Sequence, residues 1–592
     1  MMTFEFIFTS VIIAAMTVAL VREWFETDLT VFSVLILFTL GGVVSIEEAF
    51  AGFSNHGMLT VAVLFVVAGA VKRAGTLERM GDILLGRGTT VSRKLLRFMF
   101  PVSAASAFFN NTPIVAVLIP VVRSWAKKND LSVSRFLIPL SYAAILGGTC
   151  TLIGTSTNLV VHGLIIEKGL EGFSFFEISR IGVPVTFLGV LAVALFGYRI
   201  LPDRKEPVVR LGERTREFVV AMKVSSEYQN VNKTIQNAGL RHLQGLFLFQ
   251  IERKGKNMTP VGPDETIRVG DRLFFTGLPE TIMELQRTPG LSLLKEAPLD
   301  LKSDDTNHVK TYEVVISRNS PLIGRNVRES NFRSHYGAVI VAIHRSGERI
   351  RRKIGDVVLR SGDTLLILAD RSFLGRWYHS RDFYLVSESI PLAAAPGWKS
   401  WFSGGVLVSM VVVMAIQWLP ILTAASAGAV LLLLSGCISP SEARQSIDWG
   451  VLLVIASALG IARALDNSGV AYFLAGRLLG NLGPLGVMGL VAGIYFMTSV
   501  YTTVITNNAA AALIFPVAFS VTRQAGLDPR PFFLAVAMAA STSFATPIGY
   551  QTNLMVYGPG GYKFKDFLKI GIPMNLFVGI VAITLIYLYF YR

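Results

Sequence analysis

The stretch Asn110-Asn111-Thr112-Pro113 lies inside a long apolar run, and Thr506-Asn507-Asn508 lies inside a second such run near the other end of the chain. In each run a proline follows the central asparagine after nine residues. Amides and hydroxyls at membrane depth cost free energy unless a partner or a ligand uses them. Because this cost recurs in two matching places, we expect both stretches to belong to a functional site around which the chain is organised.

The composition is that of a membrane protein. The 592 residues are 52% hydrophobic and 16% charged, with a mean hydropathy of +0.53. Several apolar runs reach the ~20 residues that cross a bilayer, and Phe4 to Val21 is interpreted as a span rather than a signal peptide, because it has no basic n-region. The formal charge is +15, but basic residues cluster beside the spans, which indicates cytoplasmic flanks rather than nucleic-acid binding. Cys150 and Cys437 lie in apolar context and indicate neither disulfides nor a metal site.

The segment near residues 93–123 is expected to be a re-entrant hairpin. A basic block between Lys72 and Arg97 precedes the apolar run Phe98 to Val122, and Arg123, Lys127 and Lys128 follow it. Basic flanks at both ends place both ends on the cytoplasmic face. The tip would then be Asn110-Asn111-Thr112-Pro113, where irregular backbone is tolerated only if it is buried or lines a cavity.

Two longer apolar runs are interrupted. Phe136 to Ile166 contains Gly147-Gly148 and Gly154-Thr155-Ser156-Thr157-Asn158, and Phe532 to Tyr557 contains the loop Thr546 to Asn553. Glycine, proline and hydroxyl residues within a span favour a broken helix with an unwound middle. Such breaks expose helix ends and backbone carbonyls that can bind ions.

The two membrane halves match in sequence. Asn111 and Asn158 are 47 residues apart, and Asn507 and Asn553 are 46 apart. The further matching positions are Ser106 with Thr502, Pro120 with Pro516, Gly154 with Gly549, and Ile181-Gly182-Val183-Pro184 with Ile570-Gly571-Ile572-Pro573. Five crossings and a hairpin take each half across the membrane, so the halves should be inverted. The predicted fold class is a polytopic α-helical membrane protein, an inverted repeat with two re-entrant hairpins and two broken helices.

The domain boundaries follow from a change of composition. The first membrane repeat is expected over 1–203 and the second over 399–592, with its hairpin near 487–521. Between them charge is frequent and apolar runs are short, which predicts a cytoplasmic α/β insert. Gly270-Asp271-Arg272-Leu273 and Gly362-Asp363-Thr364-Leu365 recur at a spacing of 92 residues. We therefore expect two similar small domains, 204–298 and 299–398.

The polar residues at the tips and breaks suit ion binding. A sodium ion is coordinated by hard oxygens, which Asn, Ser and Thr side chains and freed carbonyls supply. An anion is bound by N–H donors, hydroxyls and helix N-termini. No Lys or Arg lies within either tip, so an anion would depend on neutral donors. The structural alternative is that the asparagines hold helices together, the hydroxyls bond to helix carbonyls and the prolines are kinks.

These motifs resemble the divalent anion–sodium symporter family, whose hairpins are tipped Ser-Asn-Thr. The tips here, Asn110-Asn111-Thr112 and Thr506-Asn507-Asn508, keep the central asparagine and differ beside it. The resemblance implies sodium ligands Ser106, Asn110, Asn111 and Gly154 for one ion, and Thr502, Asn507, Pro547 and Gly549 for the other. It implies substrate contacts from Asn111, Thr112, Thr155, Ser156, Thr157, Asn507, Asn508 and Thr552.

The first break resembles the sulfate-type branch of that family. The dicarboxylate branch usually has Gly-Thr-Pro-Pro-Asn where this chain has Gly154-Thr155-Ser156-Thr157-Asn158. The insert resembles a tandem pair of C-terminal domains of potassium-conductance regulators, through Ser320-Pro321-Leu322-Ile323-Gly324-Arg325 and the Gly355 to Asp363 stretch. That likeness implies dimer formation, and leaves open whether the insert binds a small molecule or only assembles the protein.

The predicted function is sodium-coupled symport of a small divalent anion, with sulfate favoured, by alternating access across the inner or plasma membrane. The alternatives are a dicarboxylate symporter, an ion or metalloid antiporter of related fold, and a sensor that signals through the insert. An enzyme is not expected, because no nucleophile–base pair or metal cluster is evident. Sodium is the expected ion, with no organic cofactor, a lipid bilayer around the chain, a homodimer as the assembly and no nucleic-acid partner.

Overall fold

The computed structural model describes most of the chain. The described residues are 3–22, 24–74, 91–129, 131–203, 219–240, 246–254, 256–258, 261–262, 264–277, 288–294, 309–317, 320–345, 348–350, 354–370, 372–377, 380, 382–385, 397–547 and 549–592. Part of the basic block before the first hairpin, residues 75–90, lies outside them, as do most of the boundaries predicted for the insert.

The membrane part consists of two series of helices. The first runs α1 (Phe4–Val21), α2 (Thr27–Leu40), α3 (Ile46–Phe50), α4 (His56–Arg73), α6 (Val91–Ser106), α7 (Asn111–Lys128), α8 (Leu137–Gly148), α9 (Ser156–Glu167) and α10 (Ser179–Leu195). The second runs α15 (Gly397–Ala415), α16 (Ile421–Leu434), α17 (Pro440–Ser446), α18 (Trp449–Asn467), α19 (Val470–Leu482), α20 (Gly486–Val504), α21 (Asn507–Ala525), α22 (Arg530–Ser541), α23 (Gln551–Tyr557) and α24 (Phe564–Tyr591).

Within the described residues, six helical segments are long and apolar enough to cross a membrane. They are Ile46–Val71, Ser179–Arg199, Gly397–Ala415, Trp449–Asn467, Val470–Val504 and Phe564–Tyr591. Shorter apolar helices, α8 and α22 among them, lie between these segments. A helix of 12 residues is only ~18 Å long, so α8 and α22 end within the membrane part rather than spanning it.

The duplication extends to local capping. Ser45 and Glu48 form a capping box at the start of α3, and Ser439 and Glu442 form one at the start of α17. In each box the serine hydroxyl accepts from the third helical N–H while the glutamate accepts from the serine N–H, which fixes where the helix begins. The two series also interlock, because α4 packs on α16 and α17 while α18 packs on α2 and α3.

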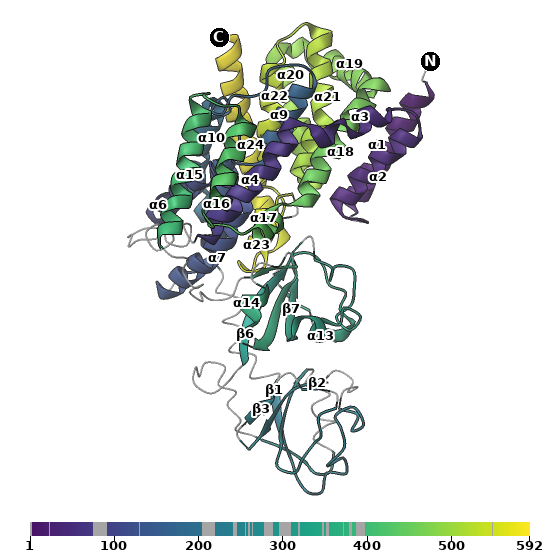
Figure 1. Cartoon of the computed structure of the whole chain (residues 1–592), viewed down its shortest axis with the longest axis vertical. Helices are drawn as coiled ribbons and strands as arrows, with labels where there is room; N and C mark the ends of the chain where they lie inside the picture. Colours follow the sequence, from purple (N-terminus) through teal and green to yellow (C-terminus); the bar gives the residue numbers. More distant parts are fainter. Residues whose placement is uncertain are drawn as a thin grey trace.

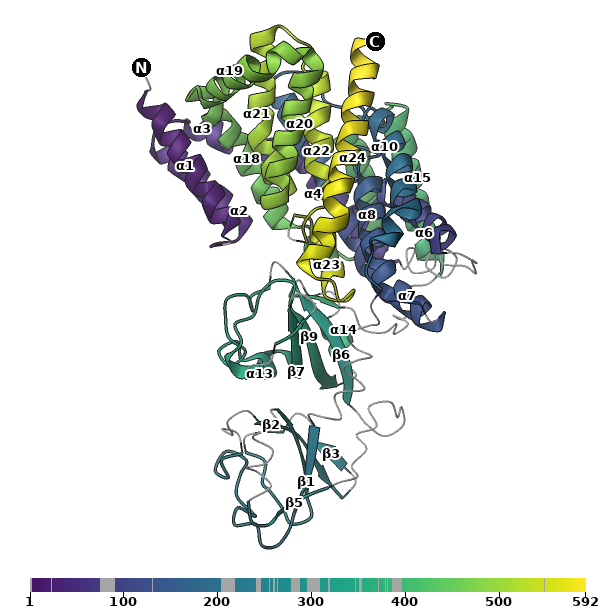
Figure 2. The same ribbon diagram turned by 180° about the vertical axis from the view of Figure 1, so that it is seen from behind.

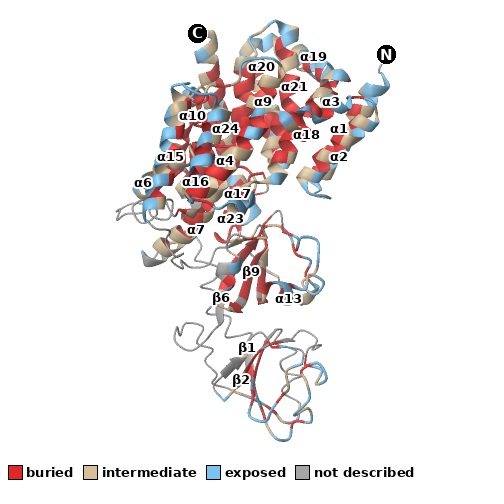
Figure 3. Ribbon diagram, viewed as in Figure 1, coloured by how far each residue is buried: buried red, intermediate tan, exposed pale blue. Residues whose placement is uncertain are grey.

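The interrupted helices occupy the centre of the membrane part. Every residue of α8 is buried, and so is every residue of α22 after Arg530. Figure 3 shows the buried residues concentrated where the two series meet, with exposed residues on the outer helices. The ends of α8 and α22, where the chain unwinds, are therefore enclosed by protein, as irregular backbone in a membrane requires.

The insert contains two sheets of five strands. The first has the order β3-β2-β4-β1-β5 and the second the order β10-β6-β9-β7-β8. The strands of the first are β1 (Val219–Val224), β2 (Leu246–Arg253), β3 (Lys256–Met258), β4 (Arg272–Gly277) and β5 (Leu291–Leu293). Those of the second are β6 (Val309–Ile316), β7 (Ala338–Arg345), β8 (Glu348–Arg349), β9 (Thr364–Asp370) and β10 (Phe383–Leu385).

The two sheets share one register at the 92-residue spacing. Lys223 pairs with Arg272 in the first sheet, and Val315 pairs with Thr364 in the second. Both sheets also contain the same ion pair to a buried aspartate. Arg253 Nε lies 2.8 Å from Asp271 Oδ1 in the first sheet, and Arg345 Nε lies 2.7 Å from Asp363 Oδ1 in the second. We call residues 219–294 unit 1 and residues 309–385 unit 2. Figures 1 and 2 both place unit 2 between the membrane helices and unit 1.

Candidate functional site

The first tip is the turn between α6 and α7. Asn111, the first residue of α7, is fully buried. The Ser106 hydroxyl lies 2.7 Å from Asn111 Oδ1 and 2.8 Å from the Ala144 carbonyl of α8. Asn111 Nδ2 donates to the Tyr550 hydroxyl at 2.5 Å. Asn111 is thus linked through Ser106 to α8 of the first repeat, and through Tyr550 to the second repeat.

The second tip, between α20 and α21, repeats the first arrangement. The Thr502 hydroxyl lies 3.3 Å from Asn507 Oδ1 and 3.0 Å from the Ala540 carbonyl of α22. Each central asparagine is therefore oriented by a hydroxyl five residues earlier and by the preceding half-helix of its own repeat. Asn507 is half-buried whereas Asn111 is fully buried, so the second tip is the more open of the two.

A second asparagine in each repeat holds the unwound segment. Asn158 Nδ2 donates to the carbonyls of Gly148 at 3.4 Å and Thr151 at 2.9 Å. Asn553 Nδ2 donates to the carbonyls of Ser543 at 3.0 Å and Thr546 at 3.1 Å. These amides satisfy carbonyls that the break leaves without helical partners, which would otherwise be costly in a membrane.

Glycines of the broken helices lie against oxygen atoms of each tip. A Cβ on Gly148 would lie 2.6 Å from Asn111 Oδ1, and one on Gly154 would lie 2.5 Å from the Gly148 carbonyl. At the other tip, a Cβ on Gly549 would lie 3.2 Å from the Thr502 carbonyl. The residues present fit a hard cation in their chemistry, since the oxygens are neutral amide, hydroxyl and carbonyl groups, and the glycines let the backbone come close to them.

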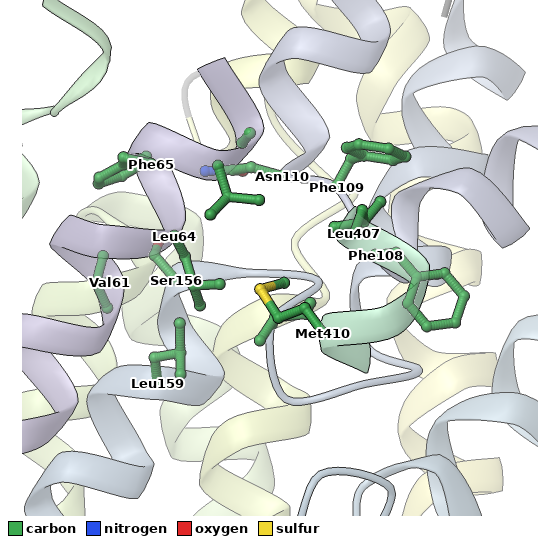
Figure 4. A pocket seen from close by; sticks show the side chains of 13 residues that line it. Val61, Leu64, Phe65, Phe108, Phe109, Asn110, Ser156, Leu159, Leu407 and Met410 are labelled. Atoms are coloured by element: carbon green, nitrogen blue, oxygen red, sulfur yellow. The ribbon is translucent and has the colours of Figure 1, made fainter. Parts of the chain in front are cut away.

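Three other predicted residues lie differently. Asn110 lines a small cavity of ≈ 40 Å³ between α4, α9 and α15. Figure 4 shows Asn110 and Ser156 among apolar side chains there. Pro547 is buried in the second loop. The Thr552 hydroxyl accepts from the Ser141 hydroxyl at 2.9 Å, so its side chain is directed at α8 rather than at a tip.

The tips and loops contact each other across the repeats. From the first repeat, the hydroxyls of Ser156 and Thr157 donate to Asn508 Oδ1 at 3.2 and 3.1 Å. From the second repeat, the Tyr550 hydroxyl lies 3.3 Å from the Thr155 hydroxyl, and Gln551 Oε1 accepts a hydrogen bond from the Thr112 hydroxyl at 3.1 Å. The predicted substrate residues at the tips and in the first loop are thereby brought into one polar cluster.

Tyr550 and Gln551 were not predicted as site residues. They occupy the positions that match Thr155 and Ser156 in the first loop, so placing the two loops side by side would have identified them. Their side chains are larger, and they reach Asn111 and Thr112 on the opposite tip. The cluster therefore contains a phenol hydroxyl and a glutamine amide in addition to the asparagine amides and small hydroxyl residues that the sequence suggested.

At two helix N-termini in the cluster, the N-cap side chain does not accept a hydrogen bond from the first-turn backbone N–H groups. The N-caps Thr155 of α9 and Thr506 of α21 make no side-chain cap hydrogen bond. The Thr506 hydroxyl is buried and has no hydrogen-bond partner among the described residues. Backbone N–H groups and the positive dipole end at a helix N-terminus favour an anion. In the described part of the chain no group of three or more His, Cys, Asp or Glu residues is present that could hold a metal ion.

A duplicated set of membrane helices whose two broken helices meet in an uncharged polar cluster is the architecture of a membrane transporter. The model of the Citrate transporter family matches residues 17–522 and 490–592 of the chain. The chain belongs to this family, and it is an integral membrane protein.

Several relatives match along nearly the whole chain, and some of them are named as transporters or cotransporters. The "Putative sulfur deprivation response regulator" of Chlamydomonas reinhardtii is 36% identical over 96% of this chain and 99% of its own length. An "Uncharacterized transporter" of Synechocystis is 33% identical over 98% of this chain and 96% of its own length. "Sodium/sulfate cotransporter 1" of Chlamydomonas reinhardtii is 26% identical over 95% of this chain and 88% of its own length. The predicted resemblance to divalent anion–sodium symporters is confirmed by these findings.

Proposed function

We propose that the protein is a sodium-coupled symporter of a small divalent anion, with sulfate as the favoured substrate. The observation that carries the proposal is the pair of matching Ser106–Asn111 and Thr502–Asn507 arrangements, each beside a broken helix. Two equivalent sets of neutral oxygens suit two sodium ions, whose charges would balance a divalent anion held between them. A relative named as a sodium/sulfate cotransporter supports both the ion and the substrate.

The anion would be bound by neutral donors. Thr155, Tyr550 and Gln551 supply hydroxyls and an amide, and the N-termini of α9 and α21 supply backbone N–H groups. We infer that Tyr550 and Gln551, which now bond to the tips, exchange these partners for the anion when the site loads. Binding without a lysine or arginine favours release on the other side, which a transporter needs as much as capture.

The proposed mechanism is alternating access. In this proposal α6–α7 and α20–α21 are re-entrant hairpins of inverted repeats, the insert is cytoplasmic, and the protein is a homodimer. The positive flanks of the first hairpin support the orientation. Sodium would order each tip before the anion enters, because the central asparagine would serve both the ion and the cluster.

Uptake by the purified protein in proteoliposomes tests this function. We expect labelled sulfate uptake to require an inward sodium gradient and to be competed by molybdate more than by phosphate, succinate or citrate. Uptake that is unchanged when potassium replaces sodium would overturn the symport mechanism. Stronger competition by succinate or citrate than by molybdate would instead assign a dicarboxylate substrate.

A second candidate function is a sensor, because one relative is named as a response regulator for sulfur deprivation. Removing residues 204–398 separates the two. A transporter that carries a regulatory insert should change its rate or affinity on this deletion. A sensor should retain its anion binding and lose its effect on sulfur-dependent growth.

A further inference from the structure

Unit 2 of the insert is packed against the membrane helices. Val315 on β6 is fully buried and belongs to the same apolar core as the central helices. Tyr384 on β10 packs against that core as well. Both views of the molecule place this unit beside α7 and α23 (Figures 1 and 2). The contact therefore involves the two helices whose first residues belong to the polar cluster.

A buried ion pair connects α7 with β6. Arg123 Nη2 lies 3.0 Å from Glu313 Oε2, and the two side chains are only 12% and 8% exposed. Removing one partner of such a pair leaves an uncompensated buried charge, which is strongly destabilising. The pair therefore ties unit 2 to the helix that carries Asn111 and Thr112 at its other end.

The turn before β9 is in close contact with α23. A Cβ on Gly362 would lie 2.6 Å from Leu554 Cδ1, and Gly362 has a φ of +81°, which L side chains rarely adopt. A Cβ on Gly558, just after α23, would clash with the Thr364 hydroxyl oxygen. Two glycines thus allow the backbones of unit 2 and the second broken helix to approach each other directly.

A short series of hydrogen bonds runs from unit 2 into the cluster. Gln551 Nε2 donates to the Tyr384 hydroxyl at 2.6 Å. The other end of the same amide, Oε1, accepts from the Thr112 hydroxyl at 3.1 Å. Because the amide is planar, the bond to Tyr384 fixes the direction in which Oε1 points. The neighbouring residue, Tyr550, is in turn held by Asn111.

Unit 1 has different residues at four of the five positions that make these contacts, and only the glycine is shared. At the 92-residue spacing its equivalents of Glu313, Val315, Gly362, Thr364 and Tyr384 are Ala221, Lys223, Gly270, Arg272 and Ser292. Arg272 is instead paired with Glu252 within its own sheet, at 3.2 Å. An apolar residue, an acid and a tyrosine are thus present only on the unit that touches the membrane part. Docking is a property of these side chains rather than of the fold that both units share.

We propose that Tyr384 is a positioning residue of the transport site. It holds the Gln551 amide so that its carbonyl oxygen faces Thr112, and the docked unit 2 thereby sets the affinity for the anion. Displacement of unit 2 frees the Gln551 side chain and changes that affinity, because an anion-binding amide loses its fixed direction. This inference rests on the proposed function for its effect on uptake, but not for its effect on local structure.

The test compares the full chain with Tyr384→Phe, which removes the hydroxyl and keeps the ring in the core. Two quantities are measured in lipid nanodiscs and proteoliposomes: amide hydrogen exchange over residues 544–552, and the KM and maximal rate of sodium-driven sulfate uptake. We expect faster exchange in that loop and a KM altered about three- to tenfold, with a maximal rate within about twofold of wild type.

Tyr336→Phe is the matched control. Its hydroxyl donates to Asp382 within unit 2, at 2.8 Å, so its loss should leave both the loop and the KM unchanged. Burial, with the hydrogen bond to the Asp382 carboxylate, raises the pKa of Tyr336 above its ordinary value, so this hydroxyl stays protonated. A double variant, Tyr384→Phe with Gln551→Ala, should have the KM of Gln551→Ala alone.

The outcomes separate the two proposals. Wild-type exchange and KM in Tyr384→Phe, or effects that multiply in the double variant, would overturn the positioning role. A wild-type protein that takes up no divalent anion would overturn the proposed function, and the exchange measurement would still decide whether Tyr384 orders the loop.

Discussion

The two repeats hold their tips with the same hydrogen bonds but face each other with different side chains. Ser106 and Thr502 orient the central asparagines in the same way. Across the repeats the partners differ, because the second loop extends Tyr550 and Gln551 to the first tip. From the first loop, the short hydroxyls of Ser156 and Thr157 reach the second tip, where both donate to Asn508.

The hydrogen bonds within each repeat are therefore duplicated, whereas the contacts between the repeats are not. What is duplicated is the arrangement of neutral oxygens at each tip, where the proposed function places one sodium ion per repeat. What is not duplicated lies between the tips, where the proposed function places the anion. The asymmetry continues outward, since Gln551 of the second loop donates to Tyr384 of the insert.

The largest effect should come from the central asparagines. Asn111→Ala should reduce sodium-dependent uptake about a hundredfold, because it removes one of the two hydrogen-bond partners of each of the buried Ser106 and Tyr550 hydroxyls, at about 1–3 kcal/mol each. Asn507→Ala should reduce it about tenfold, because Asn507 is half-buried and accepts one such bond from Thr502. Sodium activation curves measure both. Wild-type curves for the two variants would refute the assignment of the sodium sites.

The loop asparagines should matter for stability in both repeats. Asn158→Leu and Asn553→Leu each remove two hydrogen bonds to loop carbonyls, so we expect a loss of about 2–4 kcal/mol in the free energy of unfolding. Thermal unfolding in detergent measures this. Asn129→Ala is a control, because that side chain bonds to Trp125 at an exposed helix end. Equal melting temperatures for all three variants would show that the breaks do not depend on these amides.

An intermediate effect on the KM for the anion is expected at Tyr550 and Thr155, the matching loop positions at which the two repeats differ. Tyr550→Phe removes the hydroxyl bonded to Asn111 and should raise the KM for the anion about five- to twentyfold. Thr155→Val, at the matching position of the other loop, should raise it about threefold, because the Thr155 hydroxyl makes only the longer 3.3 Å contact. Equal changes in the two variants would indicate that the loops contribute symmetrically.

The smallest effect should be at Thr506. Its hydroxyl has no partner among the described residues, so Thr506→Val should leave the melting temperature unchanged. If this donor serves the anion, the KM should still rise about two- to fivefold. The matching variant Asn110→Leu should leave the KM unchanged, because Asn110 lines a mainly apolar cavity, and Ser156 in the same lining is hydrogen-bonded to Asn508 instead. An altered KM for Asn110→Leu alone would reverse our view of which tip is the more open to substrate.

The residues at the breaks and tips could be found from the sequence because their signals are local. Glycine, proline and paired amides within apolar runs identify a helix end wherever it lies, and the repeat identifies each of them twice. Thr552 shows the limit of that argument. By spacing it matches Thr157, yet its hydroxyl bonds to Ser141 whereas that of Thr157 bonds to Asn508. Equivalent positions in a repeat share a backbone, but not the partners that the other repeat presents.

The sequence by itself determined the membrane class, the duplicated order of spans, the position of both breaks and the tandem insert. All of these depend on hydropathy and on short motifs, which act over one or two helical turns. The tertiary structure decided that Tyr550 meets Asn111, that Gln551 lies between Thr112 and Tyr384, and that unit 2 packs on α7 and α23. These contacts join residues that lie 167 to 439 positions apart in the chain. Side-chain direction and close packing fix such pairs, and neither is encoded in any local stretch of sequence.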